Sequence, residues 1–148
     1  MRKKFLTYKQ FKSIYTRVPR LCVDLVIVKR KKVLLTKRSI PPFKGMWHFP
    51  GGSVLYREKI TEAIKRIAKT ELGIKIAPQK FLGYMEIETM KDGYKHSVSL
   101  AFKCKIIGNK QPRPIQQASE INFFVKLPKK IIREHVIFLN KNWKKIFE

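Results

Sequence analysis

The sequence is poor in cysteine, with only Cys22 and Cys104 in a chain of 148 residues. The two are far apart and have no histidine partner at a zinc-ligand spacing, which argues against both a disulfide framework and a zinc site. The longest apolar run, 21–28, is too short to cross a bilayer and is interrupted by Asp24. The basic N-terminus is not followed by the apolar core of a signal peptide. We therefore expect a cytoplasmic protein without a membrane partner.

Acidic residues are also scarce, with 10 Asp and Glu against 34 Lys and Arg, and the formal net charge is +24. Such an excess suits a polyanionic partner such as RNA, the steering of a phosphate-rich substrate, or a lysine-rich bias of solvated faces. The lysines are scattered through every segment, without the interleaved aromatic residues typical of nucleic-acid interfaces. We therefore expect no more than weak, non-specific nucleic-acid binding.

No repeat or low-complexity tract divides the chain, and its length suits one domain, 1–148. Residues 1–20 form an N-terminal extension, in which Thr7 is placed to cap an amphipathic helix that reaches Val18. A turn at 91–93 joins two strands as a hairpin. We expect strands at 21–28, 33–38, 81–90, 94–107 and 120–125, and helices at 59–72 and from Pro128 through Trp143. Strands and helices alternate without a regular βαβ rhythm, which predicts an α+β fold with a mixed β-sheet between helices.

The segment 51–74 contains glycines and charged residues at set spacings: Gly51, Gly52, Glu58, Arg66, Glu71 and Gly73. Consecutive glycines let the backbone turn tightly and approach a ligand. Positions 67, 70 and 71 lie on one face of the predicted helix, and Glu71 is the single carboxylate there. Gly73 is suited to end that helix. Carboxylate and carbonyl oxygens are the ligands that Mg²⁺ takes, and a tight glycine turn and Glu71 can offer both.

This segment resembles the Nudix box, the signature of hydrolases that act on nucleoside diphosphates linked to another group. Ile67 and Thr70 stand where two acids of the box belong. The resemblance implies the Nudix α/β/α sandwich and a Mg²⁺ ion, with Mn²⁺ as an alternative, held by Glu71 and the Gly51 carbonyl. It assigns a structural role to the four remaining motif residues, with an ion pair between the two charged ones: Gly52, Glu58, Arg66 and Gly73.

The reduced box and several residues outside it resemble the GDP-mannose mannosyl hydrolase branch. The resemblance implies that Asp24, Arg38 and His96 contact the nucleotide sugar, with the Arg38 guanidinium on phosphate. The alternative for Asp24 is a salt bridge with Lys37 or Arg38, because strand pairing across the 29–32 turn would bring them near. The alternative for His96 is a strand histidine satisfied by a neighbour. His48 suits a site or a structural role, and His135 is expected to be exposed.

The branch carries a Gln-His pair before its last strand, where this chain has Gln117 and Ala118. The resemblance assigns Gln117 to the metal, whereas the general base is missing. We predict Mg²⁺-dependent hydrolysis of a nucleotide sugar like GDP-mannose at the sugar C–O bond, with Glu71, Arg38 and Asp24 as catalytic residues. The alternatives are ordinary pyrophosphohydrolysis at phosphorus and a catalytically weak module that binds nucleotide or RNA. The oligomeric state stays open, with a homodimer as one alternative.

Overall fold

The computed structural model describes residues 5–41, 43–89 and 95–148. Within them, seven strands form one mixed sheet with the order β3-β2-β1-β6-β5, in which β4 also pairs with β1 and β7 with β2. The strands β1 and β6 run parallel, and the other pairs are antiparallel. The predicted 91–93 turn lies outside the described residues. The strands are β1 (Arg20–Lys29), β2 (Lys32–Arg38), β3 (Trp47–His48), β4 (Gly51–Ser53), β5 (Lys75–Thr89), β6 (Lys95–Ile107) and β7 (Ala118–Phe124).

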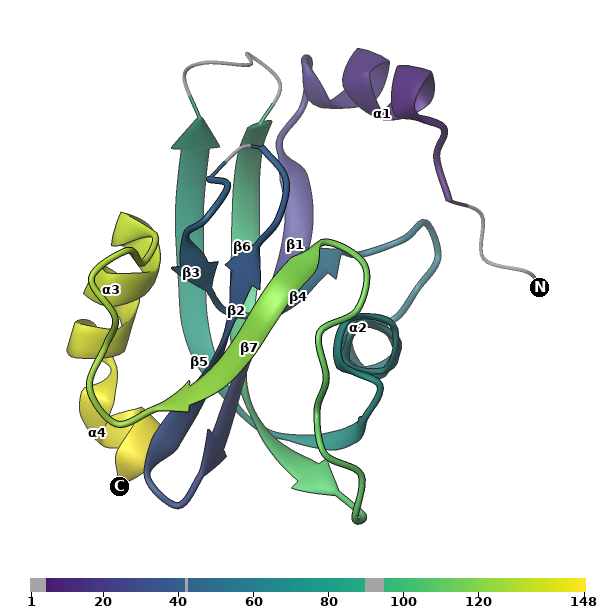
Figure 1. The fold of residues 1–148 in the computed structure, drawn as a ribbon. Coiled ribbons are helices and arrows are strands. Elements are labelled where there is room, and N and C mark those ends of the chain that lie inside the picture. The colour runs from purple at the N-terminus through teal and green to yellow at the C-terminus, as the bar shows by residue number, and fades with distance from the viewer. Residues whose placement is uncertain (1–4, 42, 90–94) are drawn as a thin grey trace.

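Helices cover both sides of this sheet. Helix α2 (Ile60–Ile67) lies on one side and continues as a π-helical turn over Ala68–Leu72, while α3 (Arg133–Lys141) and α4 (Trp143–Phe147) lie on the other (Figure 1). The predicted α+β sandwich is therefore confirmed. The described helices include none that is long and apolar enough to span a membrane.

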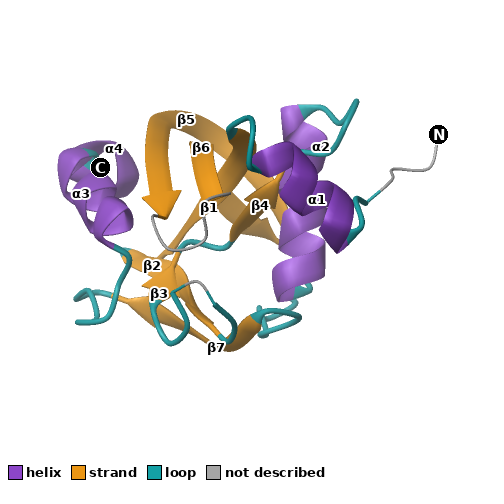
Figure 2. Cartoon of the chain, turned by 90° about the horizontal axis from the view of Figure 1, so that it is seen from above, coloured by secondary structure: helices purple, strands orange, loops and turns teal. Residues whose placement is uncertain are grey.

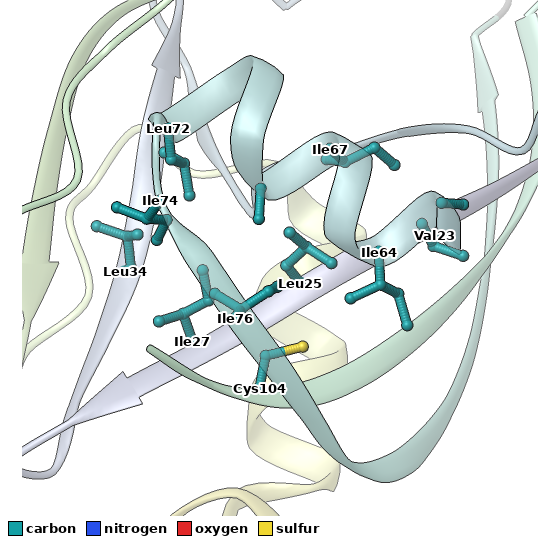
Figure 3. Close-up of a cluster of buried hydrophobic side chains, with 12 residues drawn as sticks. Val23, Leu25, Ile27, Leu34, Ile64, Ile67, Leu72, Ile74, Ile76 and Cys104 are labelled. Carbon is teal, nitrogen blue, oxygen red and sulfur yellow. The ribbon is translucent and has the colours of Figure 1, made fainter. Parts of the chain in front are cut away.

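Strand β1 is the centre of the core because both of its faces are covered. Val23, Leu25 and Ile27 pack into a buried cluster with α2, which Figure 3 shows together with Ile67. Val26 points the opposite way and packs into the cluster beside α3. Since side chains alternate along a strand, Asp24 and Cys22 lie on the Val26 face, away from α2.

The N-terminal helix forms behind the predicted Thr7 cap, as α1 (Tyr8–Tyr15), but it ends before the predicted Val18. The Thr7 hydroxyl accepts a hydrogen bond from the Gln10 backbone N–H, and the Gln10 side chain accepts one from the Thr7 N–H. This reciprocal capping satisfies two backbone donors at the start of the helix. Helix α1 lies next to the start of β1 (Figure 1), and the view from above shows it on the side away from α3 and α4 (Figure 2).

Strand β5 starts at Lys75, six residues before the predicted start, because a proline in it is tolerated. Pro78 is in the edge strand of the sheet, at the first of two register shifts, where a missing N–H breaks no regular ladder. The second shift is at Gly83, whose φ of 136° suits glycine. Proline is disfavoured within a strand by local sequence rules, so the sequence predicts that β5 begins after Pro78.

The helix predicted to begin at Pro128 instead begins at Arg133. The preceding residues are held extended by backbone hydrogen bonds with β3, from Trp47 N to Lys130 O at 2.7 Å and from Ile132 N to Trp47 O at 3.0 Å. These contacts join residues more than 80 positions apart in sequence. The start of α3 is therefore fixed by tertiary pairing that no local pattern indicates.

Candidate active site

A buried ion pair fixes the loop before α2 to the helix. The Arg66 guanidinium donates to both Glu58 carboxylate oxygens, at 2.8 and 3.1 Å, and to the Ser53 carbonyl at 2.7 Å. The Glu58 carboxylate also accepts from the Leu55 N–H at 3.1 Å, and its side chain is fully buried. The predicted Glu58–Arg66 pair is formed, and it braces the loop rather than lining the cavity.

The two positions that lack the acids of the box have different surroundings. Ile67 is buried in the core cluster, under Gly52, where it contributes to packing. Thr70 is half-buried, and its hydroxyl lies 3.4 Å from the Ile67 carbonyl. Glu71 lines a small cavity, and burial raises the pKa of its carboxyl while the charges of Arg38 and Arg66 act to lower it. One carboxylate of the helix thus faces the site.

Backbone hydrogen bonds bring Glu71 next to residues distant in sequence. The loop after β6 donates from Arg113 N to Leu72 O and from Ile115 N to Glu71 O, at 3.0 and 3.2 Å. These carbonyls are at the C-terminal end of the helical segment, where no partner within the helix remains. The same loop carries Gln117, whose carbonyl accepts from the Ser39 N–H and hydroxyl at 2.8 and 2.7 Å. Ser39 follows Arg38, so three segments meet here.

The small cavity opens beside a larger one of about 820 Å³, and both are lined by Arg38, His48, Gly51 and Gln117. Glu71 and Ala118 line the small cavity, and Asp24 lines the large one. Five of the six residues that the sequence assigns to catalysis, substrate or metal are therefore gathered around one connected space. The exception is His96, which is exposed on β6 in register with Glu88 and lines neither cavity.

Asp24 is buried and its carboxylate accepts a short hydrogen bond from the Ser99 hydroxyl. The alternative of a salt bridge to Lys37 or Arg38 is not formed among the described residues. Strand β1 pairs with β2 only at the hairpin end, and farther along it is flanked by β6 and β4. Burial raises the pKa of Asp24 to about 7, although Ser99 and Arg20 act to lower it. In the sequence, Ser97 and Ser99 are two positions apart, which places two polar side chains on one face of β6 and is the local signal for a partner of this kind.

Arg38 is the main cationic group where the two cavities meet. Burial lowers the pKa of its guanidinium, the charge of Arg20 lowers it further, and Glu71 raises it. Its Nη2 lies 3.4 Å from the Pro41 carbonyl, and its Nε has no hydrogen-bond partner within the described residues. A desolvated guanidinium with an unused donor is suited to an anionic ligand. Arg20 also lines the large cavity, a role that the sequence analysis missed.

The two histidines near β3 are held neutral by burial. The pKa of His48 is lowered to about 4, its Nδ1 donates to the Phe49 carbonyl at 2.6 Å, and its Nε2 lies 3.3 Å from the Thr36 hydroxyl. His135 was expected to be exposed, but it is 3% exposed and its Nδ1 accepts from the Phe49 N–H at 3.0 Å. Burial lowers its pKa to about 3. The His135 ring stacks on Phe49, which ties α3 to the cavity wall.

The first glycine of the box is required by its contact with β1. A Cβ at Gly51 would lie 2.3 Å from the Asp24 Oδ1 and 2.6 Å from the Val23 carbonyl, whereas a Cβ at Gly52 would meet Ile67 at 3.4 Å. We expect Gly51→Ala to lower the free energy of unfolding by about 1 to 3 kcal/mol, the usual cost of overpacking. Gly52→Ala is the matched control with a smaller loss. Urea unfolding measures the free energy of unfolding of both variants. Equal decreases in the two variants would contradict this account of Gly51.

The raised pKa of Asp24 predicts a pH-dependent stability. Its folded value of about 7 exceeds the ordinary 3.8, so the stability from the buried neutral carboxyl is present below pH 3.8 and is lost as the pH rises through 7. Asp24→Asn stays neutral and should gain up to roughly 4 kcal/mol over the wild type between pH 4.5 and 8.5. Unfolding in the presence of a chelator tests this, because a bound metal would change the charge balance. Parallel stability curves would refute it.

The oxygen atoms around the small cavity fit a magnesium ion. Glu71 offers a carboxylate, Gln117 a side-chain amide and Gly51 a backbone carbonyl, and all three residues line this space. Mg²⁺ is commonly bound through one or two carboxylates, with water and substrate phosphates as the remaining ligands. The described residues contain no cluster of three or more His, Cys, Asp or Glu side chains, so Glu71 would be the one side-chain carboxylate among these ligands.

Comparisons with known proteins identify the family. The profile of the NUDIX domain matches residues 18–130. ADP-ribose pyrophosphatase of Methanocaldococcus jannaschii is 34% identical over 130 residues, covering 82% of this chain and 76% of that protein. Low-salt glycan biosynthesis protein Agl8 of Haloferax volcanii is 39% identical over 77 residues, covering 52% of this chain and about half, 49%, of that protein.

One solved structure resembles this chain in both fold and sequence. It is that of the MutT NUDIX hydrolase from Burkholderia pseudomallei, with a TM-score of 0.77 and 26% identity, covering 84% of this chain and 98% of that one. The region that the NUDIX profile matches, residues 18–130, includes the ion pair of Glu58 and Arg66 and the cavity residues from Asp24 to Gln117. By its sequence and its fold, the chain belongs to the NUDIX family.

Proposed function

We propose that this protein hydrolyses a nucleoside diphosphate derivative in a Mg²⁺-dependent reaction, and that its substrate is a nucleotide sugar. The observation that carries the proposal is the convergence of Glu71, Arg38 and Gln117 around one small cavity beside a much larger one. The small cavity suits a metal-bound phosphate, and the large one has room for the rest of the substrate.

The acid–base chemistry of the site favours cleavage at the sugar carbon. Attack of water at phosphorus usually relies on acidic side chains that gather metal ions and activate water. Here Ile67 is buried in the core and Thr70 bonds back to the helix, so neither supplies such a group. Cleavage of the sugar C–O bond instead needs a stabilised leaving group, which is the nucleoside diphosphate.

Each residue has a defined task in this proposal. Arg38 donates to the diphosphate and stabilises the charge that it gains as it departs. Asp24 contacts the sugar from the floor of the large cavity, held in place by Ser99. Glu71 and Gln117 would hold the metal ion, which as a Lewis acid would stabilise the same departing charge. The similarity to a protein named for glycan biosynthesis supports a sugar-linked substrate.

An isotope experiment tests which bond breaks. GDP-mannose and related nucleotide sugars should yield nucleoside diphosphate and free sugar, and ¹⁸O from labelled water should enter the sugar. Mass spectrometry of the products measures the label. Label in a phosphate, with nucleoside monophosphate and sugar phosphate as products, would refute cleavage at carbon.

A second candidate is ordinary pyrophosphohydrolysis at phosphorus. The similarity to a protein named ADP-ribose pyrophosphatase, over 82% of this chain, favours it. ADP-ribose therefore belongs in the substrate panel, where this candidate predicts AMP and ribose 5-phosphate as products. The two candidates share the metal site and Arg38, and they differ in the product that carries the label.

A further inference from the structure

We propose that the N-terminal segment from Leu6 to Arg20 provides the binding site for the nucleobase of the substrate. This inference rests on the proposed function, because it assigns the nucleoside end of a nucleoside diphosphate derivative. The site consists of the aromatic rings of Tyr8 and Phe11 and the guanidinium of Arg20. These residues belong to α1 and to the first position of β1.

Helix α1 lies outside the region that the NUDIX profile matches, which begins at residue 18. None of its residues is buried, so it contributes little to the core of the domain. Nevertheless Leu6, Tyr8 and Phe11 line the large cavity together with Asp24. Figure 1 shows α1 next to the start of β1, the strand that carries Asp24. The helix is therefore a wall that this chain adds to the cavity.

A cation–aromatic contact holds this wall against the sheet. The Arg20 guanidinium lies over the Phe11 ring, 5.3 Å from its centroid. The Phe11 ring also meets Tyr15 edge-to-face, at 4.8 Å between centroids. The first contact joins α1 to the start of β1, whereas the second lies within the helix. Tyr8 is 70% exposed and lines the large cavity.

The two connected cavities differ in their lining. Arg38, Gln117 and Glu71, which are charged or strongly polar, line the small cavity. The rings of Tyr8 and Phe11 and the flat guanidinium of Arg20 line only the large one. A nucleoside diphosphate likewise combines a charged diphosphate with a planar base. Any base can stack on aromatic rings and on guanidinium planes, so the aromatic part of the large cavity suits the base.

Two ligands separate the nucleobase from the phosphates. The probes are a non-hydrolysable nucleoside α,β-methylene diphosphate and inorganic pyrophosphate, titrated with Mg²⁺ by calorimetry. Tyr8→Ser and Phe11→Leu should each weaken binding of the nucleotide analogue by about 5- to 100-fold, the usual effect of removing one stacked ring. Binding of pyrophosphate should change less than about twofold, because it makes no stacking contact. Tyr84→Ser is the matched control, since Tyr84 is exposed on β5 and does not line the cavity.

The possible outcomes distinguish this inference from the proposed function. Equal weakening of both ligands, or no weakening of the analogue, would overturn the nucleobase site and leave the phosphate site intact. Binding of neither ligand by the wild type, without turnover of any nucleotide, would overturn both proposals. Thermal unfolding checks that each variant folds, and the exposed Tyr8 gives a variant that leaves the Arg20–Phe11 contact in place.

Discussion

Glu71→Gln should reduce turnover by about a thousandfold or more while the protein stays folded. A metal ion commonly contributes several kcal/mol to stabilising the charge of the transition state, and each 1.4 kcal/mol is a factor of ten in rate. Here Ile67 lies in the core and Thr70 carries no charge, so Glu71 has no acidic substitute on its helix face.

Steady-state kinetics with a nucleotide sugar and Mg²⁺ measures this effect, and circular dichroism checks the fold. Glu86→Gln is the matched control, because Glu86 is an exposed carboxylate on β5 that lines neither cavity. Removal of the metal with excess chelator should have the same consequence as the Glu71 substitution. Activity that persists in either case would show that the metal site has been assigned to the wrong residue.

Breaking the Glu58–Arg66 pair should have the largest effect on stability. The Glu58 side chain is fully buried and that of Arg66 is 19% exposed, so either group alone would be a largely desolvated charge. We expect Glu58→Gln and Arg66→Met each to lower the free energy of unfolding by about 3 to 5 kcal/mol. The double variant should lose less than the sum, with a coupling energy of about 0.5 to 3 kcal/mol.

Urea unfolding of the wild type, the two single variants and the double variant gives this coupling directly. The comparison is informative because Arg66 also donates to the Ser53 carbonyl, a contact that Glu58→Gln leaves intact. Purely additive losses would mean that the two side chains stabilise the loop independently. Because the pair lines no cavity, turnover per folded molecule should change far less than in Glu71→Gln.

The parts that sequence predicts well are those in which a short spacing sets the geometry. Glu58 and Arg66 are eight positions apart, and the intervening loop and helix leave little freedom in where they meet. Gly73 ends its helix in the left-handed conformation, with φ of 67°, as a glycine at that position predicts. The Thr7 cap is local for the same reason.

The errors have a different origin, because they depend on which strands become neighbours. Asp24 bonds to Ser99, 75 positions away, since β1 leaves β2 after its hairpin end and is flanked by β6. His135 is buried because Phe49, 86 positions away, donates to it. The position of α1 beside the cavity likewise cannot be predicted from the sequence pattern. Periodicity indicates that a residue is apolar or polar on a face, but not which distant segment covers that face.

The main-chain hydrogen bonds between the loop after β6 and the end of the α2 segment have a consequence for engineering. Ile115 N and Arg113 N bond to carbonyls, and the Gln117 carbonyl binds Ser39, so the path of the loop is set without the side chains at 117 and 118. Substitution of those two side chains therefore leaves these backbone hydrogen bonds in place. New functional groups introduced at Gln117 or Ala118 would be delivered to the same point beside Glu71, which makes this loop a natural place to redesign the reaction.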